Sequence, residues 1–393
     1  MGKAVLIVSA ARTPIGSLNG ALGSLPAPRL GAVAIAETVR RACISPEEVQ
    51  EVFMGNVVSA GIGQAPARQA AIYAGLPHTV GATTINKMCG SGLKAVMLAA
   101  QAIRLGEAEV IVAGGMESMT QTPYLLDRAR TGYRMGHGKL IDSMIHDGLW
   151  DVYNDMHMGI CGELCAERYD LSRDHQDEYA IQSYTRAREA QQQGGFKAEI
   201  VPVPVPGRKA DVTLVEEDEE PKRVQLDKVR TLQPAFREGG TITAANASSV
   251  NDGAAAVVLT TAERARQLGT KPLGRVVAAA SAALAPEWFT VAPATAVQRL
   301  LDRVGLRPSD VDLYEINEAF SSVALANMQI LGLSPERVNV KGGAVALGHP
   351  IGASGARILT TLLYTMAERG VHRGIAAICL GGGEAVAVLV EAI

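Results

Sequence analysis

Residues 86–117 read NKMCGSGLKAVMLAAQAIRLGEAEVIVAGGME, and a similar succession of signals returns at residues 353–384. In both places a cluster of glycine and serine precedes a helical pattern. A glycine then separates that helix from an apolar strand pattern, which leads into further glycines and a glutamate. A repeated unit of this kind indicates that the chain contains two similar halves.

Apolar strand patterns alternate with helical patterns in both copies of this unit. Two further short strand patterns, at residues 5–10 and 274–280, stand ahead of the copies. Such alternation predicts an α/β fold, because parallel and mixed sheets are covered on their faces by helices. A junction between two such halves is a reasonable place for a site.

The region between the two halves has a different texture. Its proline-alternating segment 201–206 cannot be a central strand, because proline lacks the amide donor that a ladder needs. Its acidic run at residues 216–220 is typical of a solvated turn. The sequence therefore predicts three regions. They are an N-terminal half at 1–118 that is completed by about 249–272, a loop domain at 119–248 that covers the site, and a C-terminal half at 273–393.

Composition narrows the class of protein. The 393 residues are 48% hydrophobic and only 4% aromatic, which suits close packing of helices on sheets. The net charge of −3 argues against nucleic acid as a partner. No apolar run approaches the length of a membrane span, and no signal or transit segment precedes the first strand pattern. Five cysteines without disulfide-like spacing favour a reducing compartment, so we expect a cytoplasmic protein.

Cys89 stands directly before the helical pattern at residues 93–104. The first turn of a helix offers unpaired N–H groups and the positive end of the helix dipole, and both favour a thiolate. A nucleophilic cysteine commonly needs a histidine base that is distant in sequence. His349 lies in the glycine-rich segment 348–355, and Cys379 ends a strand pattern ahead of a glycine cluster. The set predicts that one thiol holds an acyl group while the second thiol moves a proton.

Other motifs permit a structural explanation beside a functional one. Asn317 follows a strand pattern, and it either donates to a developing oxyanion or caps a helix. His157, Cys161 and Cys165 are spaced for one side of a helix. We expect these three to pack and not to hold a metal, because a fourth ligand is missing. Neither an ATP-binding loop nor a dinucleotide-binding motif is indicated.

Taken together, these segments resemble the thiolases, in particular the biosynthetic acetyl-CoA acetyltransferases, over essentially the whole chain. The resemblance implies two similar β-α-β-α-β-α-β-β halves, which form layered helices and mixed sheets, with an inserted loop domain. Its most specific blocks are residues 86–92, 246–248, 251–254, 317–320, 348–355 and 379–383.

The resemblance also implies roles for the site residues. Cys89 would accept the acyl group as a thioester, and His349 would activate that thiol and help to stabilise the oxyanion. Asn317 would hold a water at the same oxyanion, and the backbone N–H groups of Cys89 and Gly381 would form a second oxyanion hole. Cys379 would remove or return the α-proton of the second acyl-CoA. The implied reaction condenses two acetyl-CoA molecules to acetoacetyl-CoA and CoA, reversibly and with ping-pong kinetics.

The implied substrates are coenzyme A thioesters, and neither a permanently bound cofactor nor a metal is expected. Residues 124–142 resemble the loop that joins dimers into tetramers, so a homotetramer active in fatty acid metabolism is implied, with no membrane partner. The residues expected at the coenzyme are Ser248, His157, Met158, Arg223 (or the adjacent Lys222), Phe236, Ala319 and Phe320.

Three positions depart from the family pattern. Phe289 stands near the acyl pocket where short-chain members carry a methionine, Glu384 adds a carboxylate near the site, and Lys228 replaces a common serine. The first departure keeps open a degradative 3-ketoacyl-CoA thiolase of broader chain length. A non-catalytic acyl-CoA-binding protein with redox-sensing cysteines is disfavoured, because the full set of reactive residues is present.

Overall fold

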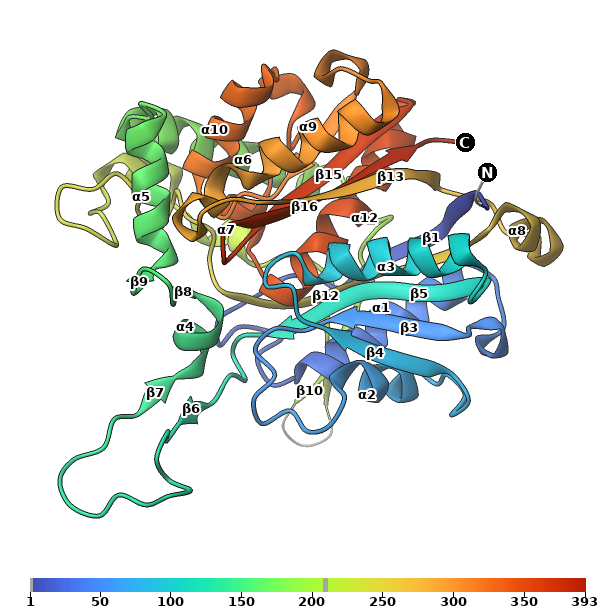
Figure 1. Ribbon diagram of the computed structural model, residues 1–393, viewed down its shortest axis with the longest axis horizontal. Coiled ribbons are helices and arrows are strands. Elements are labelled where there is room, and N and C mark those ends of the chain that lie inside the picture. The colour runs from blue at the N-terminus through green and yellow to red at the C-terminus, as the bar shows by residue number, and fades with distance from the viewer. Residues whose placement is uncertain (1–2, 208–210) are drawn as a thin grey trace.

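The computed structural model describes residues 3–207 and 211–393 (Figure 1). Its framework is a ten-stranded sheet with the strand order β14-β15-β16-β13-β1-β12-β5-β3-β4, in which β2 pairs with β12. The sheet is mixed: β14 and β15 run parallel, as do β3, β4 and β5, and the other pairs are antiparallel. The strands are β1 (Val5–Arg12), β2 (Gly16–Ser17), β3 (Glu51–Gly55), β4 (Gly81–Ile85), β5 (Val110–Ser118), β12 (Asn251–Thr261), β13 (Gly274–Ala283), β14 (Leu313–Ile316), β15 (Arg373–Leu380) and β16 (Glu384–Glu391).

The strands form two groups that meet where β1 pairs with β13, over Val5–Ile7 and Gly274–Val276. Beyond that junction the groups separate into two layers, with α3 and α12 between them (Figure 1). Helices α1 and α2 pack on one outer face, and α9, with α10 beside it, packs on the other. This architecture confirms the predicted α/β class. The helices of these layers and their connections are α1 (Ala27–Arg41), α2 (Pro66–Tyr73), α3 (Ser91–Leu105), α8 (Ala262–Leu268), α9 (Ala292–Val304), α10 (Ser321–Leu331), α11 (Ala344–Leu347) and α12 (Ile351–Arg369).

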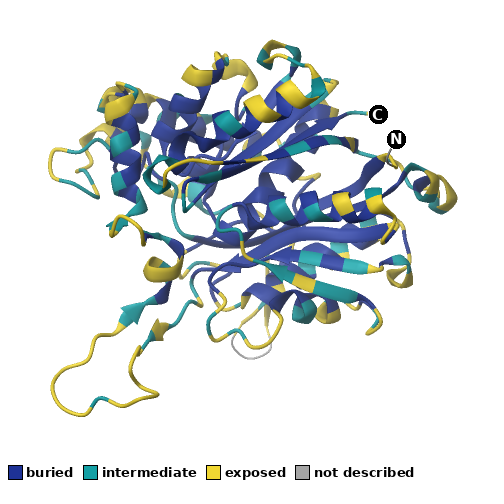
Figure 2. Ribbon diagram, in the orientation of Figure 1, coloured by how far each residue is buried: buried dark blue, intermediate teal, exposed yellow. Residues whose placement is uncertain are grey.

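The two central helices lie in the most enclosed part of the molecule. Helix α12 is buried along most of its length, and one apolar core joins its side chains to those of α3, β5, β15 and β16 (Figure 2). A helix that is apolar on nearly all sides needs such a position, because it has no polar face to turn toward water.

Glycines allow α3 and α12 to touch at their first turns. A Cβ atom on Gly92 would lie 2.9 Å from the backbone nitrogen of Ala356, and one on Gly355 would lie 2.4 Å from that of Leu93. Only residues without a side chain permit this approach. The chain segments that lead into the two helices are thereby brought together.

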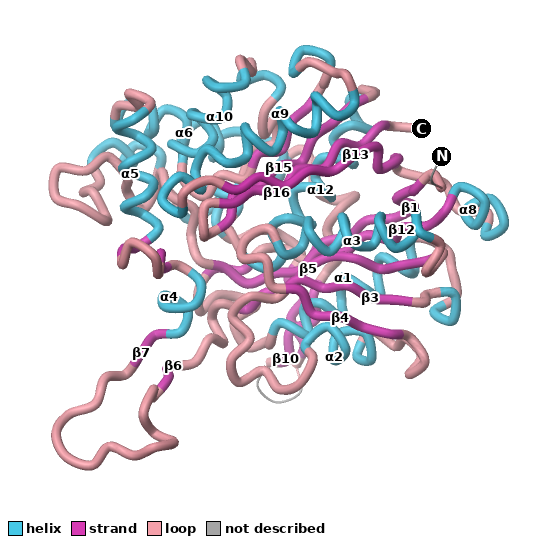
Figure 3. The backbone as a smooth tube through the Cα atoms, in the orientation of Figure 1, coloured by secondary structure: helices cyan, strands magenta, loops and turns pink. Residues whose placement is uncertain are grey.

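The region between the halves is built from short hairpins and helices (Figure 3). Segment 201–206 contributes only to a two-stranded hairpin outside the main sheet, as its prolines predicted. The hairpin that begins with Tyr124 extends far from the body of the molecule (Figure 1). The elements are β6 (Tyr124–Leu125), β7 (Ile141–Asp142), α4 (Ser143–Gly148), β8 (Trp150–Asp151), β9 (Met156–His157), α5 (Met158–Arg168), α6 (Arg173–Gln192), β10 (Val203–Pro206), β11 (Val212–Val215), α7 (Glu220–Arg223) and η3 (Leu226–Thr231). The short helix η4 (Pro286–Val291) belongs to the C-terminal half and follows β13.

The acidic run at residues 216–220 is only partly the solvated turn that the sequence predicted. Glu216 and Glu217 are exposed, but Asp218 is buried. Its carboxylate accepts two hydrogen bonds from the guanidinium of Arg12, at 2.7 and 2.9 Å, and one from the backbone N–H of Ile15 at 2.8 Å. The prediction was wrong for Asp218 because a charge run gives no sign of a buried cation that lies far away in sequence.

No helix among residues 3–207 and 211–393 has both the length and the apolar character that crossing a bilayer requires.

Candidate active site

Cys89 lies in a tight turn at the start of α3. The N–H of Gly90 donates to the carbonyl of Lys87 at 3.1 Å, and the hydroxyl of Ser91 lies 2.8 Å from the backbone nitrogen of Lys87. Within this turn Met88 has a φ of 47°, a left-handed conformation that is strained for a residue with a side chain. The strained backbone presents the partly buried Cys89 between the two layers.

The surroundings of Cys89 favour the protonated thiol over the thiolate. Burial raises its pKa to about 12, although the backbone N–H groups of Gly381 and of Cys89 itself lower it, and the carboxylate of Glu117 adds to the rise. The expectation that the helix start alone favours a thiolate was therefore wrong, because desolvation outweighs the helix end. The thiol needs a base in order to react.

His349 is the base that the sequence predicted for this thiol. It lies just before α12, its backbone N–H donates to the Asn251 side chain at 2.8 Å, and its Nδ1 lies 2.7 Å from the hydroxyl oxygen of Ser354. That hydroxyl donates its own proton to the carbonyl of Pro350 at 3.0 Å. Ser354 must therefore accept a hydrogen bond from Nδ1, which leaves Nε2 as the unprotonated ring nitrogen.

The surroundings keep this imidazole neutral. Burial lowers the pKa of His349 to about 3, and the positive charge of Arg357 contributes to the shift. A neutral ring with a free Nε2 can accept a proton at physiological pH, whereas an imidazolium cannot.

Asn317 faces the same nitrogen. It follows β14, and its side-chain Nδ2 lies 3.5 Å from Nε2 of His349. Its Oδ1 is buried and has no hydrogen-bond partner among the described residues. Phe320, and not Asn317, occupies the N-cap position of α10, so the helix-cap explanation is wrong. Asn317 is positioned to bind a small polar group beside His349.

Cys379 belongs to β15 and is fully buried. Burial raises the pKa of its thiol well above the ordinary value, and a thiolate on the neighbouring Cys89 would raise it further. The glycine turn that follows brings the N–H of Gly381 to the Cys89 sulfur, where it lowers the pKa of that thiol. The two thiols, predicted from segments far apart in sequence, thus lie in one site.

An apolar wall surrounds Cys379. Phe236 is stacked on the ring of His157, with centroids 4.8 Å apart, and meets the Phe320 ring edge-on at 6.0 Å. Ser248 lies beside this wall, where its hydroxyl donates to the carbonyl of Ala319 at 3.0 Å. The cluster around Cys379 comprises Met156, Met158, Cys161, Phe236, Ile242, Ala247, Phe289, Ala319, Phe320 and Val323. It contains four of the residues that the sequence assigned to the coenzyme.

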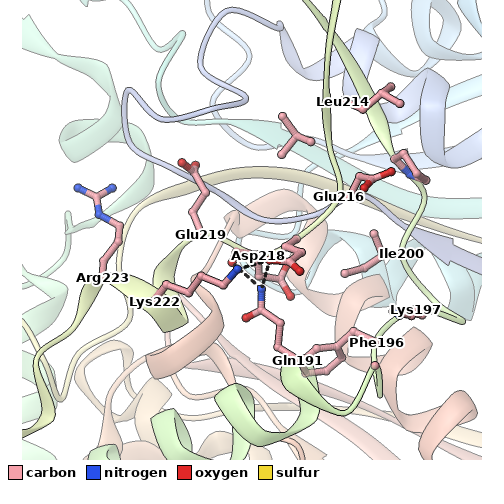
Figure 4. Close-up of a pocket in the computed structure, with 14 residues that line it drawn as sticks. Gln191, Phe196, Lys197, Ile200, Leu214, Glu216, Asp218, Glu219, Lys222 and Arg223 are labelled. Carbon is pink, nitrogen blue, oxygen red and sulfur yellow. Dashed lines mark hydrogen bonds and ion pairs between the residues drawn. The ribbon is translucent and has the colours of Figure 1, made fainter.

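Arg223 lies apart from that cluster. It lines a separate cavity of about 730 Å³ between α6, the β10–β11 hairpin and α7. There its side chain points away from Gln191 and Asp218 (Figure 4). Lys222, the alternative to Arg223, also lines this cavity, whereas none of the other residues that the sequence assigned to the site does. The adjacent Lys222 is paired with Glu217 on the surface.

Residues 5–263 match the family model of the thiolase N-terminal domain, and residues 270–392 match that of the thiolase C-terminal domain. The chain is a member of the thiolase family. This thiolase is 54% identical to acetyl-CoA acetyltransferase 2 of Arabidopsis thaliana, over 98% of the chain and 96% of that protein. It is 53% identical to an acetyl-CoA acetyltransferase of Cupriavidus necator, over 98% and 99% of the two chains.

Solved structures agree with these relatives. The acetyl-CoA acetyltransferase of Bacillus anthracis superposes on this thiolase with a TM-score of 0.97 at 40% identity. The aligned region covers 100% of this thiolase and 99% of the Bacillus chain. A thiolase of Ascaris suum in complex with coenzyme A superposes with a TM-score of 0.94 at 45% identity, with full coverage of both chains. The family resemblance inferred from the motifs is therefore confirmed.

Two buried glutamates of this thiolase support the site but were not predicted from the sequence. Glu117 is the penultimate residue of β5. It accepts hydrogen bonds from the Asn56 side chain and from the N–H groups of Val57, Val58 and Gly352, at 2.6 to 3.3 Å. It thereby fixes the first turn of α12. Its position at the end of the first repeat was a signal, but the sequence did not show what it binds.

The second of these glutamates, Glu318, follows Asn317 directly. Its carboxylate accepts hydrogen bonds from Tyr179, Ser183, Asn339 and the N–H of Val345, at 2.8 to 3.0 Å. It joins the Asn317 segment to α6 and to α11, which leads toward His349. This network supports the alignment of the Asn317–His349 pair.

Proposed function

We propose that this thiolase is an acetyl-CoA C-acetyltransferase, which condenses two acetyl-CoA molecules to acetoacetyl-CoA and CoA and also catalyses the reverse thiolysis. The observation that carries the proposal is that the two predicted thiols, Cys89 and Cys379, lie close enough to influence each other's charge, and the Asn317–His349 pair supports it as the candidate base and its neighbour. The names of the full-length relatives support the choice of the acetyl group.

In the first half-reaction, Nε2 of His349 takes the proton of Cys89. The sulfur of Cys89 attacks the thioester carbon and the tetrahedral oxyanion collapses. The departing CoA thiolate takes the proton of Cys379, so CoA leaves as the thiol and Cys379 remains as a thiolate. The N–H groups of Cys89 and Gly381 face that oxyanion, and one such donor is worth on the order of 3 kcal/mol in the transition state. The product is an S-acetyl enzyme, which makes the kinetics ping-pong.

In the second half-reaction, Cys379 removes an α-proton from a second acetyl-CoA. Its high pKa means that its thiolate, once formed, is a strong base. His349 and a water on Asn317 stabilise the enolate oxygen, and the carbanion then attacks the acetyl group on Cys89. Collapse of the resulting tetrahedral intermediate breaks the carbon–sulfur bond to Cys89 and releases acetoacetyl-CoA. The Cys89 sulfur then takes back the proton that His349 held.

The acyl pocket favours a short chain. Phe289 is buried in the wall around Cys379, together with Phe236 and Phe320. These aromatic rings limit the space beside the reacting carbon, because protein interiors are close-packed. The broader 3-ketoacyl-CoA thiolase remains the second candidate, since Phe289 replaces the methionine that is typical of short-chain members at this position.

The test is an assay with purified full-length protein, acetoacetyl-CoA and free CoA, in which loss of the enolate absorbance reports thiolysis. A series of 3-ketoacyl-CoA substrates compares chain lengths. Intact-protein mass spectrometry with acetyl-CoA should show an acetyl adduct on the wild type and none on Cys89→Ala. Absence of thiolysis, or an adduct that persists on Cys89→Ala, contradicts the proposal. Cys379→Ala should still form the adduct but should not condense it.

We propose further that the enzyme is a cytoplasmic homotetramer. The arm formed by β6, β7 and the residues between them (124–142) carries exposed apolar side chains that a monomer would leave in water. They include Tyr124 at 60% and Met135 at 98% exposure. The unpaired cysteines of the described chain suit a reducing compartment. Sedimentation velocity of the wild type against a variant that lacks residues 126–140 tests the assembly, and a wild-type monomer would contradict it.

A further inference from the structure

An ion pair connects the two segments that carry the reactive cysteines. The ammonium of Lys87, two residues before Cys89, contacts the carboxylate of Glu384, the first residue of β16. The side chains are 29% and 32% exposed, so the pair stands at the rim of the site and not in its core. A carboxylate at this position is one of the departures of this chain from its family pattern.

Two packing contacts lie alongside the pair. A Cβ on Gly381 would lie 3.5 Å from Cε of Met88, and one on Gly90 would lie 2.1 Å from Cδ2 of Leu380. The turn at Cys89 and the turn after Cys379 therefore pack along their length. We call this contact between the two turns the seam, and the Lys87–Glu384 ion pair is the charged contact at its outer end.

The two sides of the seam differ in stiffness. The backbone of Lys87 is held within the Cys89 turn by Gly90 and Ser91. The opposite turn consists of Gly381, Gly382 and Gly383, and the last two have φ values of 87° and 83°. Glycine has the largest conformational freedom of any residue, so this turn gains most from a tether at its end.

We propose that Lys87 and Glu384 form a positioning pair that holds the N–H of Gly381 at the Cys89 sulfur during acyl transfer. The inference rests on the proposed function, because that N–H faces the oxyanion of the Cys89 thioester. Neither side chain touches the reacting atoms. The pair acts through the glycine turn, and it leaves the Asn317–His349 side of the site unchanged.

Two partial reactions separate this role from a general structural one. Isotope exchange between free CoA and acetyl-CoA reports acyl transfer at Cys89, and solvent deuterium uptake at the α-carbon of acetyl-CoA reports proton transfer at Cys379. Glu384→Gln and Lys87→Met should each slow CoA exchange by about tenfold, since small misplacements of a catalytic group can cost up to about 100-fold. Deuterium uptake and the melting temperature should stay at wild-type values.

The chain offers a matched control and a rescue. Arg264 and Glu48 form an ion pair of nearly equal exposure, 28% and 31%, and neither residue belongs to the site. Glu48→Gln should leave both exchange rates unchanged. The double variant Lys87→Glu with Glu384→Lys should recover most of the CoA exchange that either single reversal loses, because the coupling between the two charges is restored.

The outcomes are distinct. Slower CoA exchange with unchanged deuterium uptake, and rescue by the double variant, support the positioning pair. Unchanged CoA exchange in Glu384→Gln, an equal fall in both exchanges, or no rescue overturns it. A wild type that neither exchanges CoA nor cleaves acetoacetyl-CoA contradicts the proposed function itself, whereas an active wild type with insensitive variants overturns this inference alone.

Discussion

Removing the hydroxyl group of Ser354 in α12 should disable His349 as a base without changing His349 itself. In Ser354→Ala the Nδ1–H of His349 loses its acceptor, which lies at 2.7 Å in a fully buried setting. An unsatisfied buried donor costs about 1–3 kcal/mol. The imidazole escapes this penalty by moving its proton to Nε2, where a rotated Asn317 amide can offer Oδ1, which has no partner among the described residues, as the acceptor. Nε2 then cannot accept the Cys89 proton.

The expected loss follows from that energy. A penalty of about 1–3 kcal/mol on the productive tautomer corresponds to a fall of about 5- to 150-fold in the rate of acyl-enzyme formation. Rapid-quench measurement of the S-acetyl adduct reports this rate directly. The binding constant for acetyl-CoA should change little, because Ser354 lies behind the imidazole.

Thr360→Val is the matched control for this experiment. Thr360 is buried in the same helix and donates to the carbonyl of Ala356 at 2.9 Å, as Ser354 donates to Pro350 at 3.0 Å. Both variants lose a hydroxyl of the same kind, but only one of these hydroxyls contacts His349. Equal acylation rates in Ser354→Ala and the wild type would refute the assignment of Nε2 as the base.

Three further predictions concern specificity and stability. Phe289→Ala should raise the ratio of the thiolysis rates for six-carbon and four-carbon 3-ketoacyl-CoA by at least about tenfold, since a methylene in an apolar pocket is worth about 1–3 kcal/mol. An unchanged ratio would place the acyl pocket elsewhere. His349 has a folded pKa of about 3 and an unfolded value near 6.5, so it stabilises the fold above pH 6.5 and loses this contribution as the pH falls toward 3. Between pH 7 and 5 the wild type should therefore lose on the order of 2 kcal/mol more unfolding free energy than His349→Gln, and parallel urea-unfolding curves would speak against this. Asp218→Asn should lower the unfolding free energy by about 3 kcal/mol, because it weakens a buried ion pair with Arg12. The control Glu217→Gln, at an exposed residue, should change the unfolding free energy by less than about 1 kcal/mol. A small effect of Asp218→Asn in chemical denaturation would show that Glu199 alone satisfies the guanidinium of Arg12.

Several features of the fold were predictable because they depend on local pattern. The helix predicted at 93–104 is α3, and the strand predicted at 375–379 is part of β15. The same helical periodicity, and a glycine after each helix, recur in both halves, so the internal repeat could be predicted as well. Segment 201–206 lies outside the main sheet for the reason that its prolines gave.

The titration states of the site could not be predicted from local pattern. The helix start at Cys89 suggested a thiolate, but desolvation by the two surrounding layers raises the pKa of the thiol instead. Burial depends on what packs around a residue, and those partners come from segments that are hundreds of positions away. The prediction for the acidic run failed at Asp218 for the same reason, since its partner Arg12 belongs to β1 and stands 206 positions earlier in the chain.

By itself the sequence determined which residue types are reactive, where helices and strands begin, and which family the chain belongs to, because these follow from short motifs and their periodicity. Only the tertiary structure decided that Nε2 of His349 is the free nitrogen, that Arg223 lies outside the apolar wall, and that Lys87 meets Glu384. Each of these depends on desolvation and on the distance between groups that no local pattern links, and close packing of distant segments sets both.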